Sequence, residues 1–248
     1  MHKTSHPTIP LKLALIGYGK MGKAIEEIAI QRGHSVVLRI DVDNPADLNH
    51  GNMAAADVAI EFTNPHSAYD NVKKCLENKL AVVCGTTGWT EKLDELKTLA
   101  EKTGTGFMYS SNYSVGVNIF FEINKKLAEL MVPQGEYEVI LEEIHHTSKK
   151  DAPSGTAISL AEQILERIKR KKKWVNELSD HPEDLEIISQ RIDPAPGTHS
   201  IRYSSPIDNI EIIHTAHSRK GFASGAVLAA EFLYEKKGFY TMKDVLGL

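Results

Sequence analysis

A glycine-rich turn between a buried strand and a helix constrains the fold of this chain more than any other feature. Residues 11–33 are LKLALIGYGKMGKAIEEIAIQRG. The run from Leu13 to Ile16 is apolar without alternation, which is typical of a parallel strand buried on both faces. Gly17, Gly19 and Gly22 follow in G-x-G-x-x-G spacing, and a periodic helix begins there. This context predicts a turn that binds the pyrophosphate of a dinucleotide.

The next predicted strand, HSVVLRID, ends in Asp41, 19 residues past the last glycine of the motif. An acidic residue about 20 residues on is expected to bind an adenosine ribose. Its carboxylate favours NADH because it repels a 2′-phosphate, but Lys20 and Arg39 are close in sequence and could offset that repulsion. The cofactor is therefore NADH, NADPH or both. The contacts expected from the motif itself are Gly17, Tyr18, Gly19, Lys20, Met21 and Gly22.

Further strands and helices alternate up to about residue 112. ADVAIEFT, LAVVCGTTG and GFMYSSN have strand character, and amphipathic helices separate them. This alternation predicts an α/β fold with a Rossmann-type, doubly wound parallel sheet. Ligands of such sheets bind at the carboxyl ends of the strands. Backbone and hydroxyl groups at these ends could line the nicotinamide part of the site: Gly85, Thr86, Thr87, Ser110, Asn112 and Tyr113.

The pattern changes in the second half of the chain. A long apolar helix, VGVNIFFEINKKLAELM, precedes the strand YEVILEEIHH and a helix over 154–173 whose charged end, 167–173, is expected to be a solvated cap. A polar stretch and two strands of period two, GTHSIRYSS and NIEIIHTAHSR, complete it. We expect a smaller α+β domain with a mixed or antiparallel sheet at 114–217, for substrate binding. Residues 1–113 and 218–248 are expected to form the dinucleotide-binding domain.

Composition excludes several classes of function. The net charge of −4 gives no reason to expect nucleic acid as a partner. No apolar run approaches the roughly 20 residues that a membrane span needs. The first ten residues, MHKTSHPTIP, lack the apolar core of a signal peptide, and only two cysteines are present. A cytoplasmic protein without a membrane partner is expected.

A dense polar cluster, EIHHTSKKDAPSGTA, occupies residues 143–157. A helix is predicted to begin within PSGT, where a capping hydroxyl leaves the first N–H groups open to an anion. With Lys149 or Lys150 nearby, this start suits a carboxylate. His145 and His146 point to opposite faces if the strand continues through them, so only one of them can face a reacting atom. A histidine here is a natural proton donor.

Zinc is the competing interpretation of the histidines. Five of them could gather around a metal: His145, His146, His199, His214 and His217. However, the chain has neither C-x-x-C nor H-E-x-x-H spacing, and lysines beside the histidines would repel a cation. No metal is expected. A second basic segment, HTAHSRKGF, offers Arg219 as a further cationic contact for an anionic substrate.

Six segments together resemble bacterial dihydrodipicolinate reductases (4-hydroxy-tetrahydrodipicolinate reductases), enzymes of lysine and diaminopimelate synthesis. The segments span nearly the whole chain: GYGKMG, EFTNP, CGTTGW, SSNYSVGVN, EIHHTSKKDAPSGTA and HTAHSRKGFASGAV. The resemblance implies an NAD(P)H-dependent oxidoreductase that reduces a ring dicarboxylate, and a homotetramer built through the second domain. Val42 stands where many members carry an Arg beside the acidic ribose ligand, which leaves NADPH preference open.

The resemblance also implies roles for single residues. His145 is expected to be the proton donor, and Lys149 a second acid or a substrate-binding group. The expected substrate contacts are His146, Ser154, Gly155, Thr156 and Arg219, and the cofactor contacts at the later strand ends are Gly85, Thr86, Thr87, Ser110, Ser111, Asn112 and Tyr113. Two alternatives remain: another two-domain amino-acid dehydrogenase, which needs a different substrate block, and a non-catalytic dinucleotide sensor, which has no use for the His-His-Lys cluster.

Overall fold

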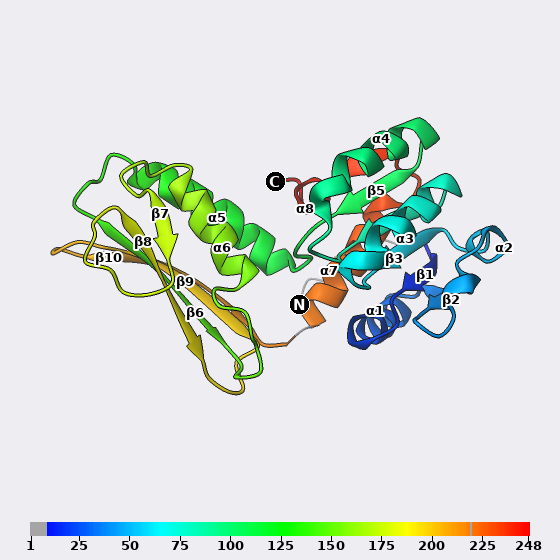
Figure 1. The fold of residues 1–248 in the computed structure, drawn as a ribbon, viewed down its shortest axis with the longest axis horizontal. Coiled ribbons are helices and arrows are strands. Elements are labelled where there is room, and N and C mark those ends of the chain that lie inside the picture. Colours follow the sequence, from blue (N-terminus) through cyan, green and yellow to red (C-terminus); the bar gives the residue numbers. More distant parts are fainter. Residues whose placement is uncertain (1–8, 219) are drawn as a thin grey trace. The chain divides into compact units, whose positions relative to one another are not determined.

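The structure, a computed structural model, describes residues 9–218 and 220–248 and divides into two compact units (Figure 1). The first unit takes in the chain up to Val115 and again from Lys220 to Leu248, and the second begins at Gly116. The chain therefore leaves the first unit once and returns to it. Within the described ranges, no helix combines the length and the apolar character that a membrane crossing requires.

A six-stranded parallel sheet forms the first unit. Its strands lie in the order β11-β5-β4-β3-β1-β2, and every neighbouring pair is parallel. The predicted doubly wound sheet is confirmed. The strand order reverses between β1 and β3, and a crevice at this switch point is where such sheets bind ligands. The strands are β1 (Lys12–Ile16), β2 (Ser35–Ile40), β3 (Val58–Glu61), β4 (Ala81–Cys84), β5 (Gly106–Tyr109) and β11 (Gly238–Tyr240).

Helices cover both faces of this sheet because successive side chains of each strand point to opposite sides. Leu13 and Leu15 pack in one core, with α1, α7 and α8, while Ala14 and Ile16 pack in the other, with α2, α3 and α4. The last long helix, α7, contacts α1 and belongs to the first unit. The helices are α1 (Lys20–Gln31), α2 (His50–Met53), α3 (Pro65–Glu77), α4 (Leu93–Thr103), α7 (Lys220–Leu233) and α8 (Met242–Leu246), with short 3₁₀ turns at Pro45–Asp47 and Thr90–Lys92.

The second unit is a five-stranded mixed sheet with two helices on one face (Figure 1). Its order is β10-β9-β6-β8-β7; β9 is antiparallel to β6 and β10, while β6, β8 and β7 are parallel. One apolar core joins the helices to alternate residues of the strands. The elements are α5 (Val115–Met131), β6 (Glu138–His145), α6 (Gly155–Leu165), β7 (Lys173–Val175), β8 (Asp184–Arg191), β9 (Gly197–Ser204) and β10 (Asn209–Ala216).

The segment around residue 170 differs from the sequence prediction. The helix α6 ends at Leu165, and the expected solvated cap is wrong at Lys171, which is only 5% exposed. Lys171 Nζ donates hydrogen bonds to Glu138 Oε2 at 2.7 Å and to the Pro182 carbonyl at 2.8 Å. These two acceptors allow the ammonium group of Lys171 to be buried between β6 and the segment before β8. The following polar stretch is not a plain loop, since most of β7 and all of β8 lie in it.

Candidate active site

A cavity of about 430 Å³ lies at the switch point of the first unit. Gly17 and Gly19 line it from the end of β1, and Asp41 and Val42 line it just after β2. The sequence predicts that the glycines bind the pyrophosphate and that Asp41 binds the adenosine ribose, and the fold places them around one space. The segment after β3 contributes the remaining wall through Phe62, Thr63, Asn64, Ser67 and Asn71.

Each glycine of the motif is required or tolerated at its position for a different structural reason. Gly17 has φ +93°, and a Cβ there would lie 2.0 Å from the Phe62 carbonyl oxygen. Gly22 lies in α1, where a Cβ would lie 2.2 Å from the Gly17 carbonyl oxygen, so it allows the helix to pack on the turn. Gly19 lines the cavity, and nothing lies within 4 Å of an added Cβ. A turn with open space at Gly19 and the first N–H groups of α1 beside it fits a dinucleotide phosphate.

The side chains around Gly19 point in different directions. Lys20 is exposed at the start of α1, whereas Met21 packs against the apolar core. Tyr18 is half-buried, and its hydroxyl donates a hydrogen bond to Glu26 on α1. The guanidinium of Arg39 lies 5.8 Å from the centre of the Tyr18 ring and binds the same carboxylate. Arg39 is therefore already occupied by protein groups.

The residues predicted at the nicotinamide end follow β4 and β5. Gly85 has no room for a side chain, because a Cβ would lie 2.1 Å from the Phe62 ring. Thr86 is buried and accepts the Thr63 N–H at 2.8 Å, whereas Thr87 is exposed. These contacts stiffen the strand end, and ligand contacts from it stay a prediction.

The segment after β5 also uses much of its polar capacity internally. Ser110 Oγ donates to the Asn112 carbonyl at 2.8 Å, and Asn112 Oδ1 accepts the Ser114 N–H at 2.9 Å, whereas Ser111 is exposed. Tyr113 is a core residue: it is 1% exposed and its hydroxyl donates to the Cys84 carbonyl at 2.8 Å. A cofactor contact from Tyr113 would therefore use its backbone.

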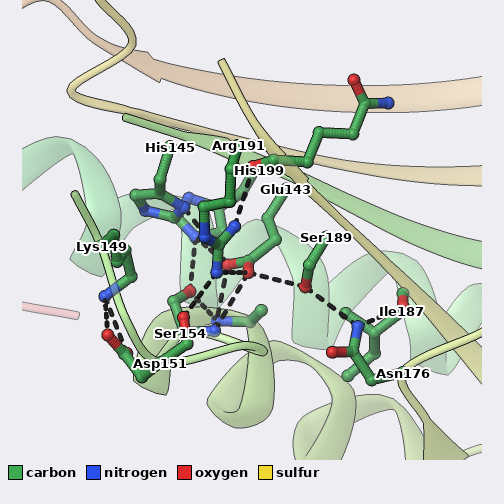
Figure 2. A network of polar contacts seen from close by, with 12 residues as sticks. Glu143, His145, Lys149, Asp151, Ser154, Asn176, Ile187, Ser189, Arg191 and His199 are labelled. Carbon is green, nitrogen blue, oxygen red and sulfur yellow. Dashed lines mark hydrogen bonds and ion pairs between the residues drawn. The ribbon is translucent and has the colours of Figure 1, made fainter. Parts of the chain in front are cut away.

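The second unit gathers its polar residues around one buried carboxylate, Glu143 (Figure 2). Its oxygens accept hydrogen bonds from the Ser154 N–H at 3.1 Å, from Ser189 Oγ at 2.8 Å and from Arg191 Nη2 at 3.1 Å. Burial alone would raise the pKa of Glu143, but hydrogen bonds from His199, Ser154, Ser189 and Arg191 hold it well below its usual value. The ionised Glu143 carboxylate thus links β6, on which it lies, to side chains of β8 and β9 and to the backbone at the start of α6.

His145 ends β6 on the same face as Glu143, since both belong to the buried set of alternating residues. Its Nδ1 lies 3.4 Å from Glu143 Oε2, and the His199 ring is 5.1 Å away, edge-on. Gly197 leaves room for it, because a Cβ there would lie 3.1 Å from His145 Nε2. Burial lowers the pKa of His145 to about 4; Glu143 opposes this shift, while His199, Lys149 and Arg191 add to it. The ring is therefore neutral at pH 7 before any ligand binds.

The loop after β6 carries the remaining cations. His146 is half-buried, and its Nδ1 lies 2.7 Å from Ser148 Oγ. Lys149 Nζ donates to both carboxylate oxygens of Asp151, at 2.7 and 2.9 Å, which lowers the pKa of Asp151. This pair is partly exposed, so an anionic ligand can compete with Asp151 for the ammonium group.

The helix start has the capping hydroxyl that the sequence predicts. Ser154 is the N-cap of α6, and its Oγ accepts the Ala157 N–H at 3.2 Å and lies 3.1 Å from His199 Nε2. Gly155 and Thr156 open the helix; Gly155 is exposed, with nothing within 4 Å of an added Cβ. The first N–H groups of a helix have no partner inside it, so this open surface suits a carboxylate.

Of the five histidines considered for zinc, His145 and His199 come together beside Glu143, with donor atoms within 4.8 Å of one another. The guanidinium of Arg191 already binds that carboxylate, which makes the position unfavourable for a second cation. His214 faces His199 across the β9–β10 pair and packs on Phe120 instead. Arg219, predicted to contact the substrate, lies outside the described residues.

Sequence reasoning misses Glu143, Ser189 and Arg191 as site residues. Glu143 lies within the 143–157 cluster, and its spacing of two from His145 places both on one strand face, which is the available signal. No comparable signal marks Ser189 and Arg191, because the strand that carries them is not predicted. In the first unit, Thr63 and Asn64 are visible only as part of the EFTNP resemblance.

Two family models match the chain. The model described as "Dihydrodipicolinate reductase, N-terminus" matches residues 11–113, and the one described as "Dihydrodipicolinate reductase, C-terminus" matches residues 116–246. Together they cover nearly all of the sequence. The second match extends through α7, although this helix packs in the first unit.

Curated relatives agree with this match. A 4-hydroxy-tetrahydrodipicolinate reductase of Christiangramia forsetii is 48% identical, over 96% of this chain and 98% of the relative. A protein of the same name from Neisseria gonorrhoeae is 34% identical, over 97% and 98% of the two chains. A solved structure, dipicolinate-bound dihydrodipicolinate reductase from Paenisporosarcina sp. TG-14, shares the fold with a TM-score of 0.78 at 24% identity, covering 94% of this chain and 98% of that one.

Proposed function

Since the chain belongs to the dihydrodipicolinate reductase family, we propose that it reduces 4-hydroxy-tetrahydrodipicolinate with NADH or NADPH in lysine (diaminopimelate) biosynthesis. The single observation that carries the assignment is the match of both halves of the chain to one reductase family. The cluster around Glu143 and His145 supports it, because a dinucleotide sensor has no use for such a group. An amino-acid dehydrogenase is disfavoured because it would need a different substrate block.

The proposed chemistry divides between the cofactor and the second unit. Loss of water from 4-hydroxy-tetrahydrodipicolinate gives dihydrodipicolinate, which has a conjugated C=C–C=N system. A reduced nicotinamide, when bound, would supply a hydride to that system. The reduced ring then needs a proton, and His145 is the proposed donor. The N-terminus of α6, at Gly155 and Thr156, binds one substrate carboxylate, and Lys149 binds and polarises the substrate after leaving Asp151.

Binding of the substrate is proposed to raise the pKa of His145 and so to bring about its protonation. The pKa of His145, lowered to about 4 by burial, leaves only about one imidazole in a thousand protonated at pH 7. The substrate brings two carboxylates close to the ring, and nearby negative charge raises the pKa of a histidine. Protonation of His145 is thus coupled to substrate binding. The imidazolium is formed mainly when a substrate is present to receive the proton.

The function is tested by steady-state oxidation of NADH and NADPH, measured side by side with enzymatically generated substrate. Substrate-dependent oxidation supports the reductase assignment. Binding of both cofactors without oxidation would show that the cavity is assigned correctly and the residue 143–157 cluster is not. Absence of cofactor binding would contradict the cavity assignment.

Lys149 provides a separate test of the substrate site. Lys149→Ala should lower kcat/KM about 10- to 100-fold, because a charge-assisted hydrogen bond to a substrate anion contributes about 1.5–3 kcal/mol. Lys150→Ala is the matched control, since Lys150 is the adjacent, exposed lysine. An unchanged kcat/KM in Lys149→Ala, or an equal loss in Lys150→Ala, would contradict the assignment.

We also propose a homotetramer assembled through the second unit. The helices α5 and α6 cover one face of its sheet, and no other described element of the second unit covers the opposite face (Figure 1). Alternate residues place isoleucines on that open face, among them Ile140, Ile144 and Ile188, and Ile213 is 58% exposed. An apolar sheet face of this kind favours self-association; the number of subunits rests on the family resemblance.

Ile213→Lys should disrupt this assembly, because it places a charge on a face that pairs with another copy. We expect a tetramer for the unmodified chain and smaller species for the variant, measured by light scattering after size exclusion. Ile123→Lys is the control, because Ile123 is similarly exposed but lies on α5. A tetramer that withstands Ile213→Lys would exclude the open sheet face as the interface.

The proposed compartment is the cytoplasm. Cys75 and Cys84 are free and buried, and burial raises the pKa of both thiols, so neither is poised to react. Unpaired, unreactive thiols are compatible with a reducing environment.

A further inference from the structure

The ribose end of the cofactor cavity carries negative charge and no basic residue in the loop beside it. Asp41 lines the cavity, and the loop that follows it, 41–47, contains two further carboxylates, Asp43 and Asp47, and no basic residue. Asn44 fixes this loop, since its Oδ1 accepts the Asp41 N–H at 2.8 Å and its Nδ2 donates to the Arg39 carbonyl at 2.9 Å. A phosphate at the ribose 2′ position would meet negative charge here.

Arg39 is the cation best placed to offset this charge. It lies on β2, two residues before Asp41, which follows the end of that strand. However, the guanidinium of Arg39 is bound to Glu26 and Tyr18 of the same unit. Arg39 Nε donates to Glu26 Oε2 at 3.2 Å, Arg39 Nη2 donates to Glu26 Oε1, and the guanidinium lies over the Tyr18 ring. The residues that line the cavity include Asp41 and Val42 but not Arg39.

Among the described residues, Arg39 is the cation that pairs with Glu26. The Glu26 carboxylate is only 13% exposed, and besides Arg39 it accepts a hydrogen bond from the Tyr18 hydroxyl. The bidentate pair with Arg39 lowers the pKa of Glu26 and raises that of Arg39, so both remain charged at neutral pH. Releasing Arg39 toward a phosphate would leave this carboxylate without its counter-charge, which is unfavourable for a poorly exposed group.

We propose that Glu26 determines cofactor specificity: by holding Arg39 against Tyr18, it withholds the cation that a 2′-phosphate needs and makes the chain prefer NADH to NADPH. Glu26 is in this role a positioning residue, since it acts through Arg39. The two lysines nearby do not replace Arg39. Lys20 is exposed at the start of α1, directly after Gly19 of the phosphate-binding turn, and Lys23 lies one turn further along the helix, over the Tyr18 ring. The inference rests on the proposed binding of NADH or NADPH.

Binding of the cofactors without substrate is the direct test. Dissociation constants for NADH, NADPH, 5′-AMP and 2′,5′-ADP are measured by calorimetry on the full chain and on Glu26→Gln. The unmodified chain should bind NADH about tenfold or more tightly than NADPH, and Glu26→Gln should tighten NADPH and 2′,5′-ADP about tenfold, since a freed guanidinium can make a charge-assisted bond to phosphate. Its affinities for NADH and 5′-AMP should change less than about twofold.

Two further variants separate release of Arg39 from the loss of one negative charge. Glu27→Gln removes the adjacent carboxylate of α1, which pairs with Lys220, and should leave all four affinities unchanged. The double variant Glu26→Gln/Arg39→Gln should lose the gain in affinity for NADPH and 2′,5′-ADP. Thermal unfolding of each variant identifies any loss of structure.

The outcomes are distinct. A gain that persists in the double variant would refute the role of Arg39, and a preference of the unmodified chain for NADPH would refute the whole inference. No gain in a folded Glu26→Gln variant would also refute it. If the unmodified chain binds neither NADH nor NADPH, the proposed function fails first, and that result is recognisable before any variant is made.

Discussion

His145→Ala should lower kcat for substrate reduction about 100- to 10,000-fold, the range expected when a general acid is removed. His145 is the histidine that the fold fixes, with its ring buried beside Glu143 and His199. The variant removes the proposed proton donor but no group that lines the cofactor cavity. We therefore expect the dissociation constant for NADH, measured without substrate, to stay the same.

His146→Ala is the matched control for this prediction. His146 follows the end of β6, is half-buried, and contacts Ser148. It should affect mainly KM, because the proposed role of His146 is substrate contact. A larger fall in kcat for His146→Ala than for His145→Ala would reverse the two roles.

The pH dependence of the same reaction provides a second readout. A proton donor must be protonated, and the pKa of His145 is lowered to about 4 in the free chain. The profile of kcat/KM reports groups of the free enzyme, whereas that of kcat reports the substrate complex. Activity should decline with rising pH in both profiles, with a higher apparent pKa for kcat because substrate carboxylates stabilise the imidazolium. Equal apparent pKa values would contradict coupling between substrate binding and protonation.

The sequence predicts the first unit well because its signals are local. The unbroken apolar strand before Gly17, the glycine spacing and Asp41 are read along one stretch of about 30 residues, and the β-α-β unit that they predict brings them to one cavity. Local signals do not reveal the wall formed by Phe62 and Asn64, since that wall depends on β3 pairing with β1. Neighbouring strands in this sheet are not always neighbours in sequence.

The second unit is less predictable because its polar residues are stabilised by distant partners. Arg191 is 48 residues from Glu143, and their ion pair forms only when β8 lies beside β6. In the same way, Lys171 looks like one more charge of a solvated helix end until Glu138 and Pro182 supply its acceptors. Side chains that are costly to bury alone become favourable in a network, and single-residue patterns do not contain the network.

Glu143→Gln should lower the free energy of unfolding at pH 7 by about 3–5 kcal/mol, because it breaks a buried charge network and leaves Arg191 without its carboxylate. The amide of Gln also brings N–H donors toward groups that already donate. Chemical denaturation of both proteins measures the difference. The neighbouring Glu142→Gln is the control: Glu142 points to the opposite face of β6, and its pair with Arg202 is loose, at 3.7 Å, so less than about 1 kcal/mol is expected.

The contribution of Glu143 to the free energy of unfolding should decrease as the pH falls. Its folded pKa lies well below the unfolded value of 4.5, so the folded state binds fewer protons than the unfolded state in the interval between these two values. The stability contributed by the carboxylate is fully present above pH 4.5 and is lost as the pH falls below it. The difference between the unmodified chain and Glu143→Gln should therefore be constant from pH 7 to about 5 and shrink at lower pH. A difference that is independent of pH down to about 3 would show that the packing of the side chain, rather than its charge, holds β6, β8 and the start of α6 together.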